Sequence, residues 1–171
     1  QFGSPDNPLC HYETTAVEIL EQMPEVDAFV CGLGTSGTAM GVGRRLKEHR
    51  RDVQIVVAEP HPGHNLQGIR SLDDGYVPPI LDIGLLDGKI LVRSADAFRA
   101  VREVLRRDGV LAGMSSGAVL HAALKWAQRV DRANIVMLFA DSGWKYLNSP
   151  AFRLDSSLED PDESFDDVLW W

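Results

Sequence analysis

One stretch of twelve residues decides the fold of this 171-residue chain. It reads Asp27-Ala28-Phe29-Val30-Cys31-Gly32-Leu33-Gly34-Thr35-Ser36-Gly37-Thr38. Residues 27–31 form a short, largely apolar run of strand length, and residues 32–38 form a glycine-rich turn. A helix is predicted from this turn to about residue 49. A strand, a tight turn and a helix in this order are typical of a strand–helix–strand unit.

The same alternation continues on both sides of this stretch. Strands are expected at residues 53–58, 89–93 and 134–140. Helices are expected at residues 12–22, after a turn-like opening at 3–8, from Ser94 as the N-cap to a stop at Gly109, and from the turn at 113–118 to about 129. Residues 61–88 contain five glycines and three prolines and are predicted to be a long surface loop with at most one short helix. Because the strands are apolar throughout, the sequence predicts an α/β fold, a parallel sheet with helices on both faces.

Composition narrows the class of protein. Hydrophobic residues make up 44% and charged residues 25%, as in one globular domain with a core. No apolar stretch is long enough for a membrane span, so no membrane is expected, and a net charge of −8 argues against binding to nucleic acid. Seven acidic residues and no basic ones lie between residue 155 and the end, and without them the net charge is about −1. We therefore separate residues 1–152, the globular part, from 153–171, an acidic and flexible tail.

The cysteines and histidines indicate no metal site. Cys10 and Cys31 lack the spacing of metal ligands, and Cys31 lies in an apolar run, so we expect it to be a buried thiol. That favours a reducing, cytoplasmic compartment. His61 and His64 have no third ligand nearby in the sequence. Because the first residue is Gln1, the chain is expected to be a fragment of a longer protein.

The glycine-rich turn is a candidate anion site. Backbone N–H groups and the positive end of the following helix dipole favour an anion at such a turn. The hydroxyls of Thr35, Ser36 and Thr38 add donors suited to phosphate. A tight connection that binds nothing is the alternative.

The same residues also match a dinucleotide-binding pattern. Gly32, Gly34 and Gly37 have the GxGxxG spacing, and Glu59 ends the next strand, where an acid that binds ribose is found. A nicotinamide-binding Rossmann domain is therefore the second candidate, although it gives no reason for Thr38 or for a second serine–glycine turn around Ser115.

Three linked motifs carry a resemblance. Gly-Thr-Ser-Gly-Thr begins at Gly34, Gly-Met-Ser-Ser-Gly-Ala begins at Gly113, and Asp-Ser-Gly-Trp-Lys-Tyr-Leu begins at Asp141. In this order and spacing they resemble the cysteine synthase and cystathionine β-synthase family of fold type II pyridoxal-phosphate enzymes, and within it the cysteine synthase B or O-phosphoserine sulfhydrylase branch. The resemblance covers nearly the whole chain. It implies that residues 1–152 are the C-terminal part of the large, cofactor-binding domain, which is incomplete here.

The resemblance also implies roles for individual residues. It assigns the phosphate of pyridoxal 5'-phosphate to Gly34, Thr35, Ser36, Gly37 and Thr38. It assigns the pyridine nitrogen to the hydroxyl of Ser115, and a neutral hydroxyl does not force that nitrogen to be protonated, which favours β-elimination. For Ser115, capping of the following helix is the alternative.

Arg70 is the candidate for substrate recognition. It lies in the long loop, where an isolated arginine is most often a solvated charge. A guanidinium matches the geometry of a phosphate, however. The resemblance implies that Arg70 contacts an anionic substrate, either O-phosphoserine or an inorganic sulfur donor.

The chain departs from the family in two places. The family's lysine that bonds covalently to the cofactor, in a Ser-x-Lys-Asp-Arg-like stretch, and its Thr-Ser-Gly-Asn-Thr-Gly-like loop for the substrate carboxylate are both absent. The lysines of this chain stand in unrelated contexts, so no catalytic residue is assigned; they are Lys47, Lys89, Lys125 and Lys145.

The resulting expectation is a fragment that is inactive alone. Joined to an N-terminal half, in a cytoplasmic homodimer, it would belong to a transferase or lyase of cysteine biosynthesis that acts on an activated serine, O-phosphoserine or O-acetylserine, and a sulfur donor. A non-catalytic interaction module derived from such an enzyme is a third candidate.

Overall fold

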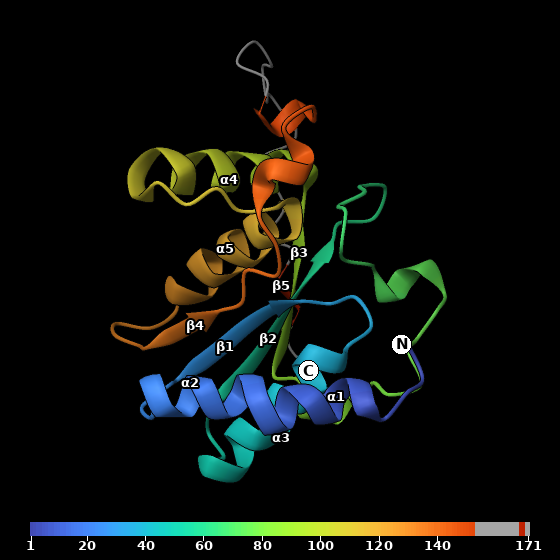
Figure 1. Ribbon diagram of the computed structural model, residues 1–171, viewed down its shortest axis with the longest axis vertical. Coiled ribbons are helices and arrows are strands. Elements are labelled where there is room, and N and C mark those ends of the chain that lie inside the picture. The colour runs from blue at the N-terminus through green and yellow to red at the C-terminus, as the bar shows by residue number, and fades with distance from the viewer. Residues whose placement is uncertain (153–167, 170–171) are drawn as a thin grey trace.

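The computed structural model describes residues 1–152 and 168–169 and shows a five-stranded sheet in the order β4-β1-β2-β3-β5 (Figure 1). The strands are β1 (Ala28–Gly32), β2 (Gln54–Pro60), β3 (Gly88–Val92), β4 (Ile135–Met137) and β5 (Val168–Leu169). The first four are parallel, and β5 runs antiparallel to β3. The predicted parallel sheet is confirmed.

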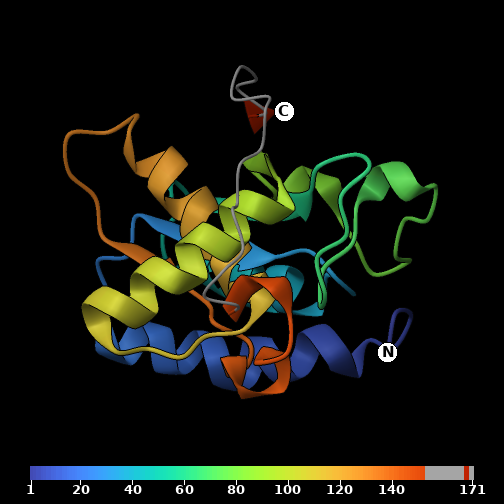
Figure 2. The ribbon, with the colours of Figure 1, turned by 90° about the horizontal axis from the view of Figure 1, so that it is seen from above.

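Helices cover both faces of this sheet, as predicted (Figures 1 and 2). On one face lie α1 (Asp6–Cys10), the π-helical turn η1 (His11–Thr15), α2 (Ala16–Gln22) and α3 (Gly37–His49), and on the other α4 (Ser94–Asp108) and α5 (Met114–Ala127). Short 3-10 helices are η2 (Leu72–Asp74), η3 (Ile83–Leu85), η4 (Gly143–Tyr146) and η5 (Pro150–Phe152).

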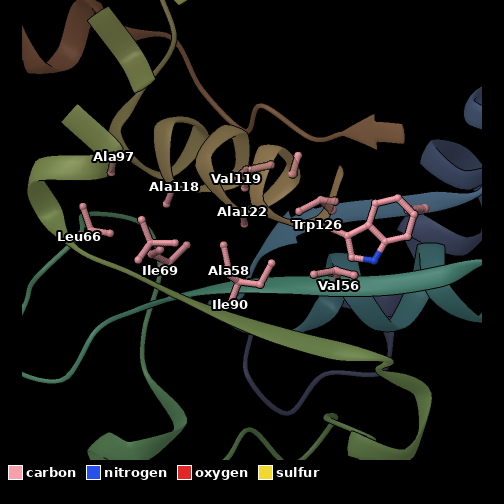
Figure 3. Packing of buried hydrophobic residues seen from close by; sticks show 14 residues of the cluster. Val56, Ala58, Leu66, Ile69, Ile90, Ala97, Ala118, Val119, Ala122 and Trp126 are labelled. Carbon is pink, nitrogen blue, oxygen red and sulfur yellow. The ribbon is translucent and has the colours of Figure 1, made fainter. Parts of the chain in front are cut away.

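The core consists of two apolar layers separated by the sheet. Val30 of β1 and Val56 of β2 belong to the buried cluster that includes Trp126 of α5, and Figure 3 shows Val56 and Trp126 together. Phe29 and Ile55, their neighbours in sequence, belong to the cluster on the α3 side. Successive side chains of a strand point to opposite faces of the sheet. A strand that is apolar at successive positions therefore needs helices on both faces to bury its side chains. Full burial of each such side chain contributes about 1.5–3 kcal/mol.

The N-terminal helix is longer than the sequence predicts. It begins at Asp6, so the expected start at residue 12 and the expected turn through residue 8 are wrong. Pro8 lies in the first turn of the helix, where a backbone N–H has no partner within the helix and a proline is therefore tolerated. The earlier start places Asn7 on the helix.

Two further boundaries differ. Ser94 is not the N-cap of α4, because Arg93 holds that position and Ser94 is the first helical residue; Gly109 does cap the C-terminus, with φ +70°. Ordered pairing in β4 ends at Met137, although Leu138 still donates its N–H to the Val30 carbonyl at 3.0 Å.

The acidic tail is described only at residues 168–169. There Leu169 pairs with Lys89 and Val168 with Ile90, a strand that the sequence analysis did not predict. Residues 153–167 and 170–171 lie outside the described part of the chain, so the flexible tail stays a prediction.

Candidate functional site

A cavity of about 180 Å³ lies beyond the carboxyl end of β1. The carboxyl edge of a parallel sheet is where open α/β folds bind ligands. The cavity collects residues from four separate parts of the chain. Its lining comprises Cys31, Gly32, Gly34, Thr35, Ser36, Thr38, Gly68, Ile69, Ser115, Val119, Leu138 and Ala140. Five of the predicted site residues, Gly34, Thr35, Ser36, Thr38 and Ser115, therefore share one cavity.

Ser36 gives this cavity the character of an anion site. It is the N-cap of α3 and has a left-handed backbone, with φ +69°, an uncommon conformation for a residue other than glycine. Its side chain is buried, and its Oγ has no hydrogen-bond partner among the described residues. A buried hydroxyl without a partner costs about 1–3 kcal/mol, and strain of this kind concentrates at functional sites. The N–H groups of the first turn of α3 begin beside it and attract negative charge.

Gly37 does not line the cavity, although the sequence grouped it with the anion loop. It faces the N-terminal helix instead: a Cβ at Gly37 would lie 2.0 Å from Oδ1 of Asn7. Asn7 in turn donates through Nδ2 to Thr35 Oγ1 at 2.9 Å. Asn7 had no predicted role in the site, because it was expected to lie in a turn.

His11 is a second residue whose position the sequence did not predict. Its Nε2 lies 3.2 Å from Thr38 Oγ1, and its Nδ1 lies 3.0 Å from Thr15 Oγ1. Burial lowers the pKa of His11, which favours the neutral ring.

Ser115 lines the same cavity from α5. The N-cap of α5 is Gly113, without a capping side chain in the described residues, so Ser115 is the second helical residue and does not cap the helix. Its side chain is only 7% exposed. Gly68, at φ +94°, lies close to it, since a Cβ there would be 3.4 Å from Ser115 Oγ.

The third sequence motif supports the start of α5. The Gly113 N–H donates to the carbonyl of Asp141 at 2.9 Å, and a Cβ at Gly113 would lie 1.9 Å from Asp141 Oδ1. Asp141 Oδ2 accepts from the Tyr146 hydroxyl at 2.8 Å. Asp141 and Tyr146 therefore fix the turn from which Ser115 projects.

Arg70 follows Gly68 and Ile69, which line the cavity, but is not itself among the described lining residues. Its N–H donates to the Leu33 carbonyl at 2.8 Å, which ties the long loop to the glycine turn. The exposed guanidinium lies over two aromatic rings, with its carbon 5.9 Å from the centre of Phe2 and 5.5 Å from that of Tyr76. This contact, which the sequence did not predict, restricts the side chain.

Glu59 is unavailable for ribose recognition. It is fully buried, and its Oε2 accepts from the Leu72 N–H at 2.9 Å and the Ser71 hydroxyl at 3.3 Å and lies 3.6 Å from Lys89 Nζ. A ribose-binding acid must present its carboxylate to the ligand. Burial in this position raises the pKa of Glu59. The structure therefore argues against the dinucleotide-binding alternative.

The four lysines, all within residues 1–152, do not line the cavity. Lys47 pairs with Asp87 at 2.8 Å, Lys89 is buried beside Glu59, and Lys145 pairs with Asp141 at 3.2 Å.

The remaining reactive groups add little to the site. Cys31 is a buried free thiol, as predicted, and burial raises its pKa to about 12. Across residues 1–152 and 168–169 there is no cluster of three potential metal ligands. No helix in these ranges has the length and apolar character needed to cross a bilayer.

Most of the chain matches one known protein family. Residues 1–141 match the family described as "Pyridoxal-phosphate dependent enzyme". The chain belongs to this family. It is similar to the cysteine synthase of Aquifex aeolicus (35% identity, 89% of this chain and 48% of the relative) and to cysteine synthase B of Salmonella typhimurium (37% identity, 89% and 50%).

Solved structures show the same relationship. The O-acetylserine sulfhydrylase isoform 3 of Entamoeba histolytica superposes with a TM-score of 0.83 at 35% identity, over 92% of this chain and 50% of that one. A hydrogen sulfide-producing enzyme of Fusobacterium nucleatum superposes with a TM-score of 0.80 at 36% identity, over 85% and 53%. The chain therefore spans about half the length of these homologues.

Proposed function

We propose that this chain is the cofactor-binding part of a β-replacement enzyme of the cysteine synthase type. In this reaction a leaving group departs from the β-carbon of an activated serine, O-phosphoserine or O-acetylserine, and a sulfur nucleophile takes its place. When bound, pyridoxal phosphate would supply the electron sink for this exchange. The proposal includes a cytoplasmic homodimer for the whole protein.

One observation carries the proposal: the unpaired Ser36 hydroxyl at the N-terminus of α3 and the Ser115 hydroxyl of α5 line the same cavity. Ser36, Thr35 and Thr38, with the first N–H groups of α3, fit a dianionic phosphate. Ser115 fits a ring nitrogen because a hydroxyl can donate to it without adding a charge. The residues present therefore fit the cofactor at both ends.

We propose that the lysine of the covalent cofactor linkage lies outside this chain. None of its four lysines lines the cavity, and three of them are held in ion pairs elsewhere. The chain alone should then bind the cofactor without a covalent bond. Borohydride treatment with pyridoxal phosphate should leave Lys47, Lys89, Lys125 and Lys145 without stoichiometric labelling, and stoichiometric reduction onto one of them would contradict this part of the proposal.

The sheet has an exposed edge with which the part of the homologues that this chain does not cover can pair. Strand β4 is an edge strand that pairs only with β1 among the described residues. Its Met137 is 38% exposed, and a groove of about 510 Å³ lies between β4 and α2. An exposed, apolar edge requires a partner. We propose that a segment of the longer protein covers it.

Equilibrium binding tests the cofactor assignment. Pyridoxal phosphate should bind the full-length protein at least about tenfold more tightly than pyridoxal, because charge-assisted hydrogen bonds contribute about 1.5–3 kcal/mol. Ser115→Asp should shift the absorption spectrum of bound pyridoxal phosphate, since a carboxylate stabilises the protonated ring nitrogen. Equal affinity for the two ligands would reject the phosphate site, and an unchanged spectrum in Ser115→Asp would reject the role of Ser115.

A further inference from the structure

The N-terminal helix contacts both threonines of the glycine-rich turn, Thr35 and Thr38. Asn7 and His11 are four residues apart and lie on one face of this helix. Asn7 Nδ2 donates to Thr35 Oγ1 at 2.9 Å, and His11 Nε2 lies 3.2 Å from Thr38 Oγ1. Since both threonines line the cavity, each hydroxyl is held between one helix and the ligand space.

Two glycines of α3 permit this close approach. A Cβ at Gly37 would lie 2.0 Å from Asn7 Oδ1, and a Cβ at Gly41 would lie 2.2 Å from the Pro8 carbonyl oxygen and 2.8 Å from the Cβ of His11. Residues four apart share a face of a helix, so both glycines face the N-terminal helix. Larger residues at either position would separate the two helices and break the contacts to the threonines.

A π-helical turn places His11 between two hydroxyls. The Ala16 N–H bonds to the His11 carbonyl, five residues earlier, instead of the usual four. Within this wider turn, His11 Nδ1 lies 3.0 Å from Thr15 Oγ1. Single π-turns inside α-helices are rare and are frequent at functional sites.

The donors and acceptors in these contacts decide where the threonine protons point. Asn7 Nδ2 also donates to the Gln1 carbonyl at 2.9 Å, which fixes the orientation of the amide. An amide nitrogen donates and does not accept, so the Thr35 hydroxyl keeps its own proton for another acceptor.

The two contacts of His11 are compatible with either tautomer of its neutral ring. A neutral imidazole carries one proton. In the tautomer with its proton on Nε2, the Thr15 hydroxyl donates to Nδ1 and Nε2–H donates to Thr38 Oγ1, and this is the tautomer that the proposal below requires. The Thr38 proton is then free for a ligand in the cavity.

We propose that Asn7 and His11 are positioning residues that orient the Thr35 and Thr38 hydroxyls as hydrogen-bond donors to the cofactor phosphate. This inference rests on the proposed function, since it assumes that the phosphate occupies the cavity. It adds an outer layer to the site, built from a part of the chain that precedes the glycine loop by about 30 residues.

Matched substitutions of His11 separate positioning from packing. His11→Gln can place an amide nitrogen near the position of Nε2, whereas His11→Asn reaches only the position of Nδ1. In the full-length protein, His11→Asn should raise the Kd of pyridoxal phosphate roughly three- to tenfold, as expected for one hydrogen bond, and His11→Gln should restore most of the affinity. The Kd of pyridoxal, which lacks the phosphate, should not change in either variant.

A double-mutant cycle tests whether His11 acts through Thr38. In a Thr38→Val background, His11→Asn should cause no further loss of affinity, because the hydroxyl that it orients is gone. Asn7→Leu and Thr35→Val form an independent cycle with the same expectation, and it decides the question if a His11 variant fails to fold.

The outcomes separate this inference from the proposed function. If the unmodified protein prefers pyridoxal phosphate to pyridoxal but the losses in both cycles are additive, or extend equally to pyridoxal, the positioning role is wrong and the proposed function stands. If the unmodified protein shows no preference for the phosphate, the proposed function and this inference both fail. Losses that are confined to pyridoxal phosphate, restored by His11→Gln and absent without the threonine hydroxyl support the inference.

Discussion

Gly41 of α3 lies directly against Pro8 of α1: a Cβ at Gly41 would be 2.2 Å from the Pro8 carbonyl oxygen. A backbone atom cannot move aside as a flexible side chain can. Gly41→Ala should therefore lower the free energy of unfolding by about 1–3 kcal/mol, the usual cost of overpacking, even though alanine favours the helix by about 1 kcal/mol. Urea unfolding measures the change.

Gly43 provides the matched control for Gly41→Ala, since it lies on the same helix. A Cβ there would meet only side-chain atoms, 3.1 Å from Leu85 and 3.4 Å from Ile55. Gly43→Ala should therefore have an effect within about 1 kcal/mol of zero, because the gain in helix propensity offsets the tighter contact. Equal losses in both variants would contradict the close helix contact.

Ser36→Ala should weaken cofactor binding without lowering the stability of the cofactor-free protein. The buried Oγ has no described partner, so its removal should leave the free energy of unfolding of the cofactor-free protein unchanged or raise it by up to about 1 kcal/mol. The same change should weaken binding of pyridoxal phosphate by about tenfold, the value of one charge-assisted hydrogen bond. Urea unfolding and a binding titration measure the two effects. Parallel losses of both would show that Ser36 has a structural role alone.

The buried Glu59 should make stability depend on pH in an unusual direction. Burial raises its pKa above the ordinary value of 4.5, so the folded state binds more protons than the unfolded state between 4.5 and the raised pKa. Stability from this group is therefore fully present below about pH 4.5 and is lost as the pH rises through the folded-state pKa. The stability of the natural protein relative to Glu59→Gln should increase as the pH falls from about 7 to about 4.5, measured by urea unfolding.

Glu103 supplies a control of opposite sign. Desolvation tends to raise its pKa, but hydrogen bonds and charges from Arg106 and Arg107 outweigh it and lower the pKa. Stability from an acid with a lowered pKa is present above its unfolded value and lost as the pH falls. The stability of the natural protein relative to Glu103→Gln should therefore decrease as the pH falls from about 7 to about 4.5. If the stability difference between the natural protein and Glu59→Gln did not change with pH, the raised pKa of the buried Glu59 would be contradicted.

Arg70→Ala should alter the choice of substrate in the full-length enzyme. A phosphate on the substrate carries nearly two negative charges, and a charge-assisted contact contributes about 1.5–3 kcal/mol. The value of kcat/KM for O-phosphoserine should fall about ten- to a hundredfold, while that for O-acetylserine, a neutral ester, should be spared.

Arg70→Lys separates charge from shape. Lysine keeps the charge but loses the planar fork and its fit against Tyr76. The value of kcat/KM for O-phosphoserine should therefore lie between that of the natural protein and that of Arg70→Ala. Equal losses for both substrates in Arg70→Ala would make the residue a support for its loop. No loss for either would make it a solvated charge.

The local features of the fold could be predicted from the sequence. An apolar run of strand length such as residues 27–31 predicts a buried strand, and a glycine-rich turn between such a run and a helical pattern predicts a connection from strand to helix. The grouping of Thr35 with Ser36 and Thr38 was predictable because these residues are adjacent. Their association with Ser115, about 80 residues away, came from the family resemblance, and the cavity confirms that they are neighbours.

Other features depended on contacts between distant segments. Glu59 has the same place in the sequence as a ribose-binding acid, but the loop that contributes Ser71 and Leu72 buries it and supplies its partners. Local sequence patterns could not predict this, because they do not show which distant segment covers the end of β2.

Tertiary packing also decided the outer part of the site. Asn7 was placed in a turn because prolines surround it, and propensity alone favours a turn there. The packing of Pro8 against Gly41 stabilises a helix instead and brings Asn7 and His11 to the threonines. Sequence by itself therefore determined the four parallel strands and the glycine-rich turn, because these follow from neighbouring residues, and the family, because three motifs occur in a fixed order and spacing. Only the tertiary structure decided which side chains support that turn, because burial and hydrogen bonds across some 30 residues of chain outweigh local preference.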